Sequence, residues 1–210
     1  MPADPPSPMP SPSGGTPAQQ GANAQELAAA LERLRSRLLA FVRLHSDAAI
    51  RARESCSDIV QSICREVLAN QDRITFQGDE AFRAWLFTWA TNKIRDRQRY
   101  WLAQKRDVRR EVAADGAADS DVLVHYRDFA TPSREAMLHE QVERIEAAFD
   151  RLPASYREVI TLARIAGLSH DEIAARLGST PGAVRTQLHR ALVRLTSELE
   201  RLESGRGSSA

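Results

Sequence analysis

The sequence has few cysteines, little lysine and no long apolar run. Its two cysteines, Cys56 and Cys64, lie in one helical pattern, so they cannot pair within a straight helix. No Cys-x-x-Cys or histidine cluster predicts a metal site. Both thiols are therefore expected to be reduced, as in a cytosolic protein, with Cys64 buried. No segment reaches the ~20 apolar residues that a membrane-spanning helix requires, so membrane insertion is not expected.

Sequence motifs for catalysis are also missing. There is no phosphate-binding loop, nucleophile elbow or metal-ligand spacing. The best candidate cluster, His170-Asp171-Glu172, fits the first turn of a capped helix, where carboxylates are favourable. We therefore predict that the protein is not an enzyme and needs no cofactor or metal.

Lysine is rare because arginine supplies 27 of the 29 basic residues, which favours bidentate contacts over point charges. The net charge is only +1, but it is unevenly distributed. Residues 25–112 carry 17 basic against 12 acidic residues, residues 113–135 carry 2 against 5, and residues 136–210 carry 10 against 10. The distribution indicates a basic first half followed by an acidic stretch.

Helical periodicity and Pro/Gly punctuation predict an all-α chain of two small helical domains joined by a flexible linker. Apolar stripes predict helices that begin near Ala24, Ser57, Ala81, Glu135, Ala154 and Ser169. A tail with seven of the ten prolines and no basic residue is expected to be disordered. The predicted divisions are a tail at 1–24, a first domain at 25–112, a linker at 113–134, a second domain at 135–203 and a frayed end at 204–210.

The second domain contains a predicted helix-turn-helix. Ser169 and Glu172 form a capping box, and Gly178 supplies the left-handed residue that ends a helix. Thr180-Pro181 then begins another helix, which apolar spacing extends to about Leu202. Two capped helices around a Gly-containing turn are typical of DNA-binding proteins.

The second helix of this motif has a basic face opposite its apolar stripe. No acidic residue occurs between Thr180 and Thr196. A helix seated by its N-terminal end in the major groove would bring this face to base edges, and arginine can bind guanine bidentately. The predicted DNA contacts are Thr180, Arg185, Thr186, His189 and Arg190. The alternative is an ordinary solvated basic face.

A second informative stretch, residues 82–112, combines aromatic and basic side chains. It holds all three tryptophans of the chain, and nine basic residues stand against three acidic ones. Phe82, Leu86 and Trp89 share one face and are expected to fill a core. Four further side chains could contact the phosphates and unpaired bases of a nucleic acid: Arg95, Arg97, Arg99 and Tyr100.

Several motifs resemble those of ECF-type (extracytoplasmic function) sigma factors, the specificity subunits of bacterial RNA polymerase. In the second domain they are Leu152-Pro-x-x-Tyr156-Arg-Glu-Val-Ile160, Gly167-Leu-Ser-x-x-Glu-Ile-Ala174 and Val184-Arg-x-x-Leu-His-Arg-Ala191. In the first domain, Asp58-Ile-Val-Gln61 resembles the family's polymerase-binding helix. Phe82-Arg-x-Trp-Leu86 and Ala90-x-Asn92 resemble its promoter-melting helix. The segment Gln104-Lys-Arg-Asp-Val-Arg-Arg-Glu111 is similar to a subgroup abundant in planctomycetes.

The resemblance implies a cytoplasmic transcription initiation factor that binds core RNA polymerase through Asp58 and Gln61. The first domain would then read the minus-ten element of promoter DNA, with Asn92 on an extruded base and Arg95, Arg97 and Arg99 on phosphates. The helix-turn-helix would read the minus-thirty-five element, and an anti-sigma factor is a further partner that the resemblance allows. Two departures, Cys64 in place of a common aromatic and Thr88-Trp89 in place of Arg-Ile, bear on how the minus-ten element is read.

The main alternative function is that of a helix-turn-helix regulator acting by DNA binding alone. It would explain the second domain. It would leave the Asp58 and Gln61 face and the tryptophan-arginine helix without a role.

Overall fold

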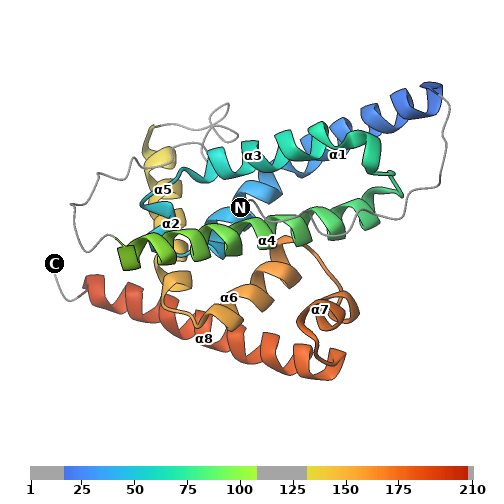
Figure 1. Cartoon of the computed structure of the whole chain (residues 1–210). Helices are drawn as coiled ribbons and strands as arrows, with labels where there is room; N and C mark the ends of the chain where they lie inside the picture. The colour runs from blue at the N-terminus through green and yellow to red at the C-terminus, as the bar shows by residue number, and fades with distance from the viewer. Residues whose placement is uncertain (1–16, 108–131, 208–210) are drawn as a thin grey trace. The chain divides into compact units, whose positions relative to one another are not determined.

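The computed structural model describes residues 17–107 and 132–207, and these residues are helical or connect helices, with no strand among them (Figure 1). The expected all-α class is therefore confirmed. The chain divides into two compact units: unit 1 comprises residues 1–42 and 49–117, and unit 2 comprises residues 43–48 and 118–210. The predicted disorder of residues 1–16 and most of the predicted linker lie outside the described residues. Of the helices described, none has the length and apolar character to span a bilayer.

Among the described residues, unit 1 is built from three main helices and two short ones, although residues 43–48 of this stretch are assigned to unit 2. In chain order they are α1 (Pro17–His45), α2 (Ala48–Arg51), α3 (Cys56–Ala69), the 3₁₀ turn η1 (Gln71–Arg73) and α4 (Asp79–Asp107). The expected helix starts at Ser57 and Ala81 were each close to those observed, whereas α2 and η1 were not predicted.

The N-terminal helix corrects one prediction, because residues 17–24 are helical rather than part of a disordered tail. Proline is well suited to a first helical position, where an N–H group has no partner to lose. Asn23 also bonds to the segment before α4: its Nδ2 donates to the Ile74 carbonyl at 2.7 Å, and its Oδ1 accepts from the Phe76 N–H at 2.7 Å. These long-range contacts stabilise a segment whose composition alone indicated disorder.

The core of unit 1 contains the apolar stripes predicted from periodicity. Its buried side chains include Leu27, Leu31, Leu38 and Phe41 of α1, Ile59, Ile63 and Val67 of α3, and Phe82, Leu86, Phe87, Trp89 and Ile94 of α4. The Phe41 and Phe87 rings meet edge to face with centroids 5.0 Å apart. The expected core role of Phe82, Leu86 and Trp89 is confirmed.

The two cysteines are both free, but the predicted burial of Cys64 was wrong. Cys56 is the buried thiol, whereas Cys64 is half-buried. Cys64 lies beside the buried positions Ile63 and Val67 rather than at the centre of the apolar face of α3. Burial nevertheless raises the pKa of the Cys64 thiol above its usual value, with nearby Arg35 acting against that rise.

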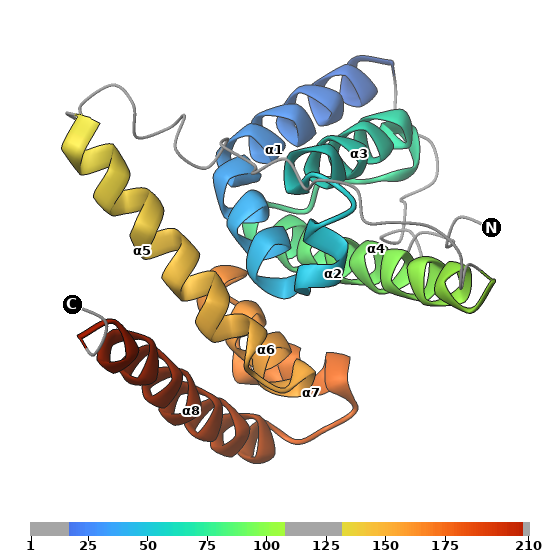
Figure 2. The same cartoon turned by 90° about the vertical axis from the view of Figure 1, so that its left-hand side faces the viewer.

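Residues 132–207 of unit 2 form four helices, and α5, α6 and α7 all contact α8 (Figure 2). They are α5 (Pro132–Asp150), α6 (Ala154–Ile160), continued by a π-helical segment η4 (Thr161–Ile165), α7 (His170–Leu177) and α8 (Pro181–Gly207). Three boundaries differ from expectation: α5 begins before Glu135, α8 runs past Leu202, and the helix expected from Ala154 to Ala166 changes its winding at Thr161. The Thr161 hydroxyl donates to the Arg157 and Glu158 carbonyls at 2.9 and 3.0 Å at that point.

A buried carboxylate ties the second half of α8 to the rest of unit 2. The Glu198 side chain is 3% exposed and pairs with Arg194 at 2.8 Å, Arg201 at 3.2 Å and Arg151 at 3.8 Å. Arg151 lies in the connection between α5 and α6, so one carboxylate joins that connection to α8. The apolar contacts of α8, through Val184, Leu188 and Ala191, hold its first half.

Candidate nucleic-acid interface

The helix-turn-helix is formed by the local interactions that its sequence predicts. The Ser169 Oγ accepts from the Glu172 N–H at 3.2 Å, and the Glu172 Oε2 accepts from the Ser169 N–H at 2.7 Å. Gly178 ends α7 with a φ of 60° and ψ of 39°, in the left-handed region. The Thr180 Oγ1 accepts from the Ala183 N–H at 3.2 Å, which caps α8. The capping box, the glycine stop and the threonine cap are confirmed.

The first three turns of α8 present the predicted basic residues outward. Thr180, Arg185, Thr186, His189 and Arg190 are all exposed, while Val184 and Leu188 are buried on the opposite side of the helix. Ion pairs of unit 2 are made by other arginines, including Arg144, Arg151, Arg194 and Arg201. The Thr186 Oγ1 donates to the Gly182 carbonyl at 3.1 Å, which fixes the rotamer of that side chain. This face therefore offers exposed cations on a rigid helix.

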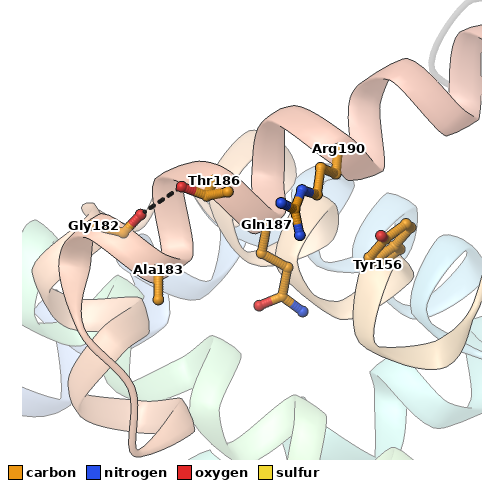
Figure 3. A pocket seen from close by; sticks show the side chains of 6 residues that line it. All are labelled: Tyr156, Gly182, Ala183, Thr186, Gln187 and Arg190. Atoms are coloured by element: carbon orange, nitrogen blue, oxygen red, sulfur yellow. Dashed lines mark hydrogen bonds between the residues drawn. The ribbon is translucent and has the colours of Figure 1, made fainter.

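A shallow hollow of about 340 Å³ lies on the same side of α8 (Figure 3). It is lined by Tyr156, Gly182, Ala183, Thr186, Gln187 and Arg190. Two of these residues, Thr186 and Arg190, were predicted as DNA contacts from the sequence, whereas Tyr156 and Gln187 were not predicted as site residues. Tyr156 belongs to α6, and helical periodicity within α8 carries no information about a neighbour from another helix. The Gln187 Nε2 donates to the Ser155 carbonyl at 3.3 Å, which links the two helices beside the hollow.

The predicted arginine cluster of α4 is divided by the fold. Arg95 and Arg99 are exposed and one helical turn apart, whereas Arg97 is half-buried and pairs with Glu54. Burial lowers the pKa of the Arg97 guanidinium below its usual value, since desolvation disfavours the charged form. Arg99 also pairs with Asp96, although its side chain remains 76% exposed. The structure thus does not bring the three arginines to one surface.

Aromatic side chains occur both before and after these arginines along the chain. Phe76, Phe82, Trp85 and Trp89 form a row with successive centroids 5.8, 5.8 and 4.9 Å apart. Asn92 lies half-buried one turn after Thr88. Further along, Tyr100 is 56% exposed, and the Arg53 guanidinium lies 5.6 Å from the Trp101 ring centroid.

The polar face predicted for α3 is present. Asp58 and Gln61 are exposed, and Arg65 and Leu68 continue the same helical stripe. The Asp58 N–H donates to the Ser55 Oγ at 3.4 Å, so this residue lies in the first turn of a capped helix. A carboxylate there also favours the helix by its position near the N-terminus. Among the described residues no cluster of three or more histidine, cysteine or acidic side chains could hold a metal.

Two family models match the chain, one in each helical region. The model described as sigma-70 region 2 matches residues 30–106, and the model described as sigma-70, region 4 matches residues 142–195. The ECF RNA polymerase sigma factor SigD of Mycobacterium tuberculosis strain H37Rv is 31% identical over 170 residues, which cover 80% of this chain and 74% of SigD. This chain belongs to the ECF RNA polymerase sigma factors.

Other sigma factors are similar over much of their length. The ECF RNA polymerase sigma-E factor of Haemophilus influenzae is 32% identical over 155 residues, 72% of this chain and 78% of that protein. Two solved structures share the fold. CnrH in complex with the cytosolic domain of CnrY has a TM-score of 0.55 at 23% identity, covering 88% of this chain and 96% of that one. RpoE in complex with the anti-sigma factor NepR, from Bartonella quintana, has a TM-score of 0.54 at 24% identity, covering 84% and 95%.

Membership of this family decides between the two functions that the sequence left open. An ECF sigma factor is a transcription initiation factor that binds core RNA polymerase and acts at specific promoters. The region 2 match spans α3 and most of the tryptophan-arginine helix, to which a regulator acting by DNA binding alone assigns no role. The similarity of residues 104–111 to a planctomycete subgroup stays a prediction.

Proposed function

We propose that the two units of this sigma factor read separate promoter elements. Unit 2 contacts the minus-thirty-five element through α8, and unit 1 binds core polymerase and contacts the minus-ten element. One observation carries the proposal: the first turns of α8 form an exposed, acid-free face on a helix whose start is fixed by a cap. Phosphate contacts need available cations, and base reading needs side chains held in a fixed position.

On α8 the proposed DNA contacts are Thr180, Arg185, Thr186, His189 and Arg190. Arg185 lies near the N-terminal end of the helix, which is the end that enters the major groove in helix-turn-helix complexes. Its guanidinium suits the two acceptors of a guanine edge. The Thr186 hydroxyl donates to its own helix, so this residue presents its methyl group and its remaining oxygen lone pair to the groove.

On α4 the proposed phosphate contacts are Arg95 and Arg99, and Asn92 contacts an extruded base. Arg97, which the sequence grouped with them, instead supports α4 through its pair with Glu54. The Asn92 role rests on its match to the promoter-melting motif of the family. A half-buried amide next to the aromatic row is compatible with a base that leaves the duplex.

On α3 the proposed polymerase contacts are Asp58 and Gln61. Promoter-dependent transcription with purified core polymerase tests this assignment and the overall function together. Asp58→Lys should reduce co-purification with core polymerase and transcription in parallel, with unchanged circular dichroism. Glu26→Lys, an exposed charge reversal on α1, is the matched control. Equal core affinity of wild type and Asp58→Lys would contradict the polymerase-binding role of this face.

The proposed function also covers the protein's partners and location. Because core polymerase is cytoplasmic, we place the protein in the cytoplasm, without catalytic activity or cofactor of its own. An anti-sigma factor that competes with core polymerase is a further proposed partner, supported by the complex in which the similar RpoE was solved. Competition between a co-expressed candidate and core polymerase for the purified chain tests this part.

A further inference from the structure

One side chain that lines the hollow beside α8 comes from another helix and is not among the proposed DNA contacts. Tyr156 comes from α6 and is half-buried, while Gly182, Thr186 and Arg190 border the same hollow from α8 (Figure 3). Its position is fixed in two ways. Pro153 is the N-cap of α6, and its carbonyl accepts from the Tyr156 N–H at 3.0 Å. The Gln187 Nε2 donates to the neighbouring Ser155 carbonyl at 3.3 Å.

The chemistry of the hollow favours an anionic, acceptor-only group. Its polar side chains include a phenol, a guanidinium, an amide and a hydroxyl, and none of its lining residues is acidic. Tyr156 and Arg190 both supply donors, which a phosphate oxygen accepts well. A base edge would need a matching pattern of donors and acceptors and would lie against the centre of the α8 face.

The placement also distinguishes a phosphate from a base. A helix seated in the major groove has base edges beneath it and phosphate rows along both sides. Tyr156 stands on a different helix, at the border of the α8 face. From the hollow, its hydroxyl would meet the sugar-phosphate row while Arg185 meets base edges.

We propose that this hollow seats one DNA phosphate of the minus-thirty-five element between the Tyr156 hydroxyl and the Arg190 guanidinium. The inference rests on the proposed role of α8, and it separates two arginines that the sequence treated alike. Arg185 reads sequence, whereas Arg190 and Tyr156 fix the register of α8 on the backbone. Tyr156 is then a contact residue on α6, outside the recognition helix.

The test uses the full chain bound to core polymerase and promoters selected from a library of upstream sequences. Tyr156→Phe removes the hydroxyl and keeps the ring, so the hollow and the fold are retained. Promoter affinity should fall about five- to ten-fold, by a similar factor on different upstream sequences. Thr196→Val, which removes a hydroxyl from an exposed position further along α8, is the control.

Methylphosphonate substitution identifies the phosphate. Replacing one upstream phosphate at a time by this neutral group should reveal a position where wild type loses affinity strongly. At that position the loss for Tyr156→Phe should be at least two-fold smaller than the loss for wild type, because the Arg190 contact is then the only one of the pair left to remove. Thr196→Val should lose affinity there as wild type does. Multiplicative losses at every phosphate, or wild-type affinity of Tyr156→Phe, would overturn the proposal.

Two further variants separate this inference from the function on which it rests. Arg190→Ala should weaken binding to all upstream sequences by a similar factor. A change in base preference for Arg190→Ala or Tyr156→Phe would mean that the hollow holds a base instead of a phosphate. Arg185→Ala should change base preference. If wild type shows no upstream preference at all, the proposed role of α8 fails. If the α8 variants behave as expected and only Tyr156→Phe binds promoters like wild type, the proposed phosphate contact in the hollow is wrong and the role of α8 is retained.

Discussion

The arginines of α4 and those of α8 look similar in the sequence but have different surroundings in the fold. Arg97 is 22% exposed and pairs with Glu54, which is 21% exposed and lies 43 residues earlier in the chain. Arg99 pairs with Asp96 within its own helix. Arg185 and Arg190 are exposed in a segment without acidic residues. A count of positive charge therefore overstates the nucleic-acid contacts of α4 more than those of α8.

The comparison shows which part of the charge is available to a partner. A half-buried guanidinium with a carboxylate neighbour is already desolvated and neutralised by the fold, so a phosphate would have to compete with that carboxylate. An exposed guanidinium on an acid-free face exchanges only water and counterions for a phosphate or a base. Substitutions in the two helices should therefore have different effects.

The largest expected effect is on stability, for Arg97→Ala. Removing one partner leaves the half-buried Glu54 carboxylate without its cation, so the free energy of unfolding of unit 1 should fall by about 2–3 kcal/mol. Urea unfolding followed by tryptophan fluorescence measures this unit specifically, because all three tryptophans lie in α4. Arg95→Ala, a control on the exposed face, should change stability by less than about 0.5 kcal/mol. Wild-type stability of Arg97→Ala combined with defective promoter opening would instead make Arg97 a DNA contact.

The next effect concerns sequence reading by Arg185. Arg185→Ala should relax the preference at one or two base pairs of the upstream element by about 1–3 kcal/mol, because a bidentate contact to guanine is lost. Binding of the polymerase-bound chain to a library of upstream sequences measures the preference directly. Arg194→Ala, which removes an arginine paired with Glu198, serves as the control on the same helix. An even loss across sequences for Arg185→Ala would mean that Arg185 holds a phosphate.

Features encoded within one or two helical turns could be predicted from the sequence. The capping box at Ser169 and Glu172, the glycine stop at Gly178 and the threonine cap at Thr180 depend on neighbours three or four residues away. The apolar stripes of α1, α3 and α4 follow from helical spacing in the same way. Such features are local, and composition and spacing are sufficient to find them.

What could not be predicted depends on contacts between distant residues. The Glu54 partner of Arg97 and the Ser155 partner of Gln187 come from other elements, and no periodicity links them. Asn23 belongs to a segment whose composition indicated disorder, yet it bonds residues about 50 positions later, near α4. The hollow next to Tyr156 arises only when α6 packs on α8. For the candidate site, exposure and helical face were therefore predictable, whereas pairing was not.

A smaller effect is expected for the exposed arginines of α4. If Arg95 and Arg99 each hold one phosphate near the melted segment, the double alanine variant should lower the slope of log affinity against log salt by about 1–2 during open-complex formation. Arg97→Lys, which keeps a cation next to Glu54, should leave the slope as in wild type. Permanganate footprinting of the melted segment over a salt series gives the measurement. An unchanged slope for the double variant would assign both side chains to a solvated face.

The smallest effect, and the one with opposite signs in two assays, is expected for Gly182→Ala. Gly182 lies in the first turn of α8, and a Cβ built there meets nothing within 4 Å, so the free protein has room for alanine. Alanine loses less conformational entropy on folding than glycine, so unit 2 should become more stable by about 0.5 kcal/mol. The same methyl group would project from the face proposed to meet DNA, and promoter affinity should fall about two- to five-fold.

Gly205→Ala makes the identical change near the other end of α8 and should affect stability without affecting promoter affinity. Hydrogen exchange of α8 amides and promoter binding by the polymerase-bound chain measure the two quantities. If Gly182→Ala raises stability and leaves promoter affinity at the wild-type value, DNA does not approach this turn closely, and the basic face of α8 must meet the groove further along the helix.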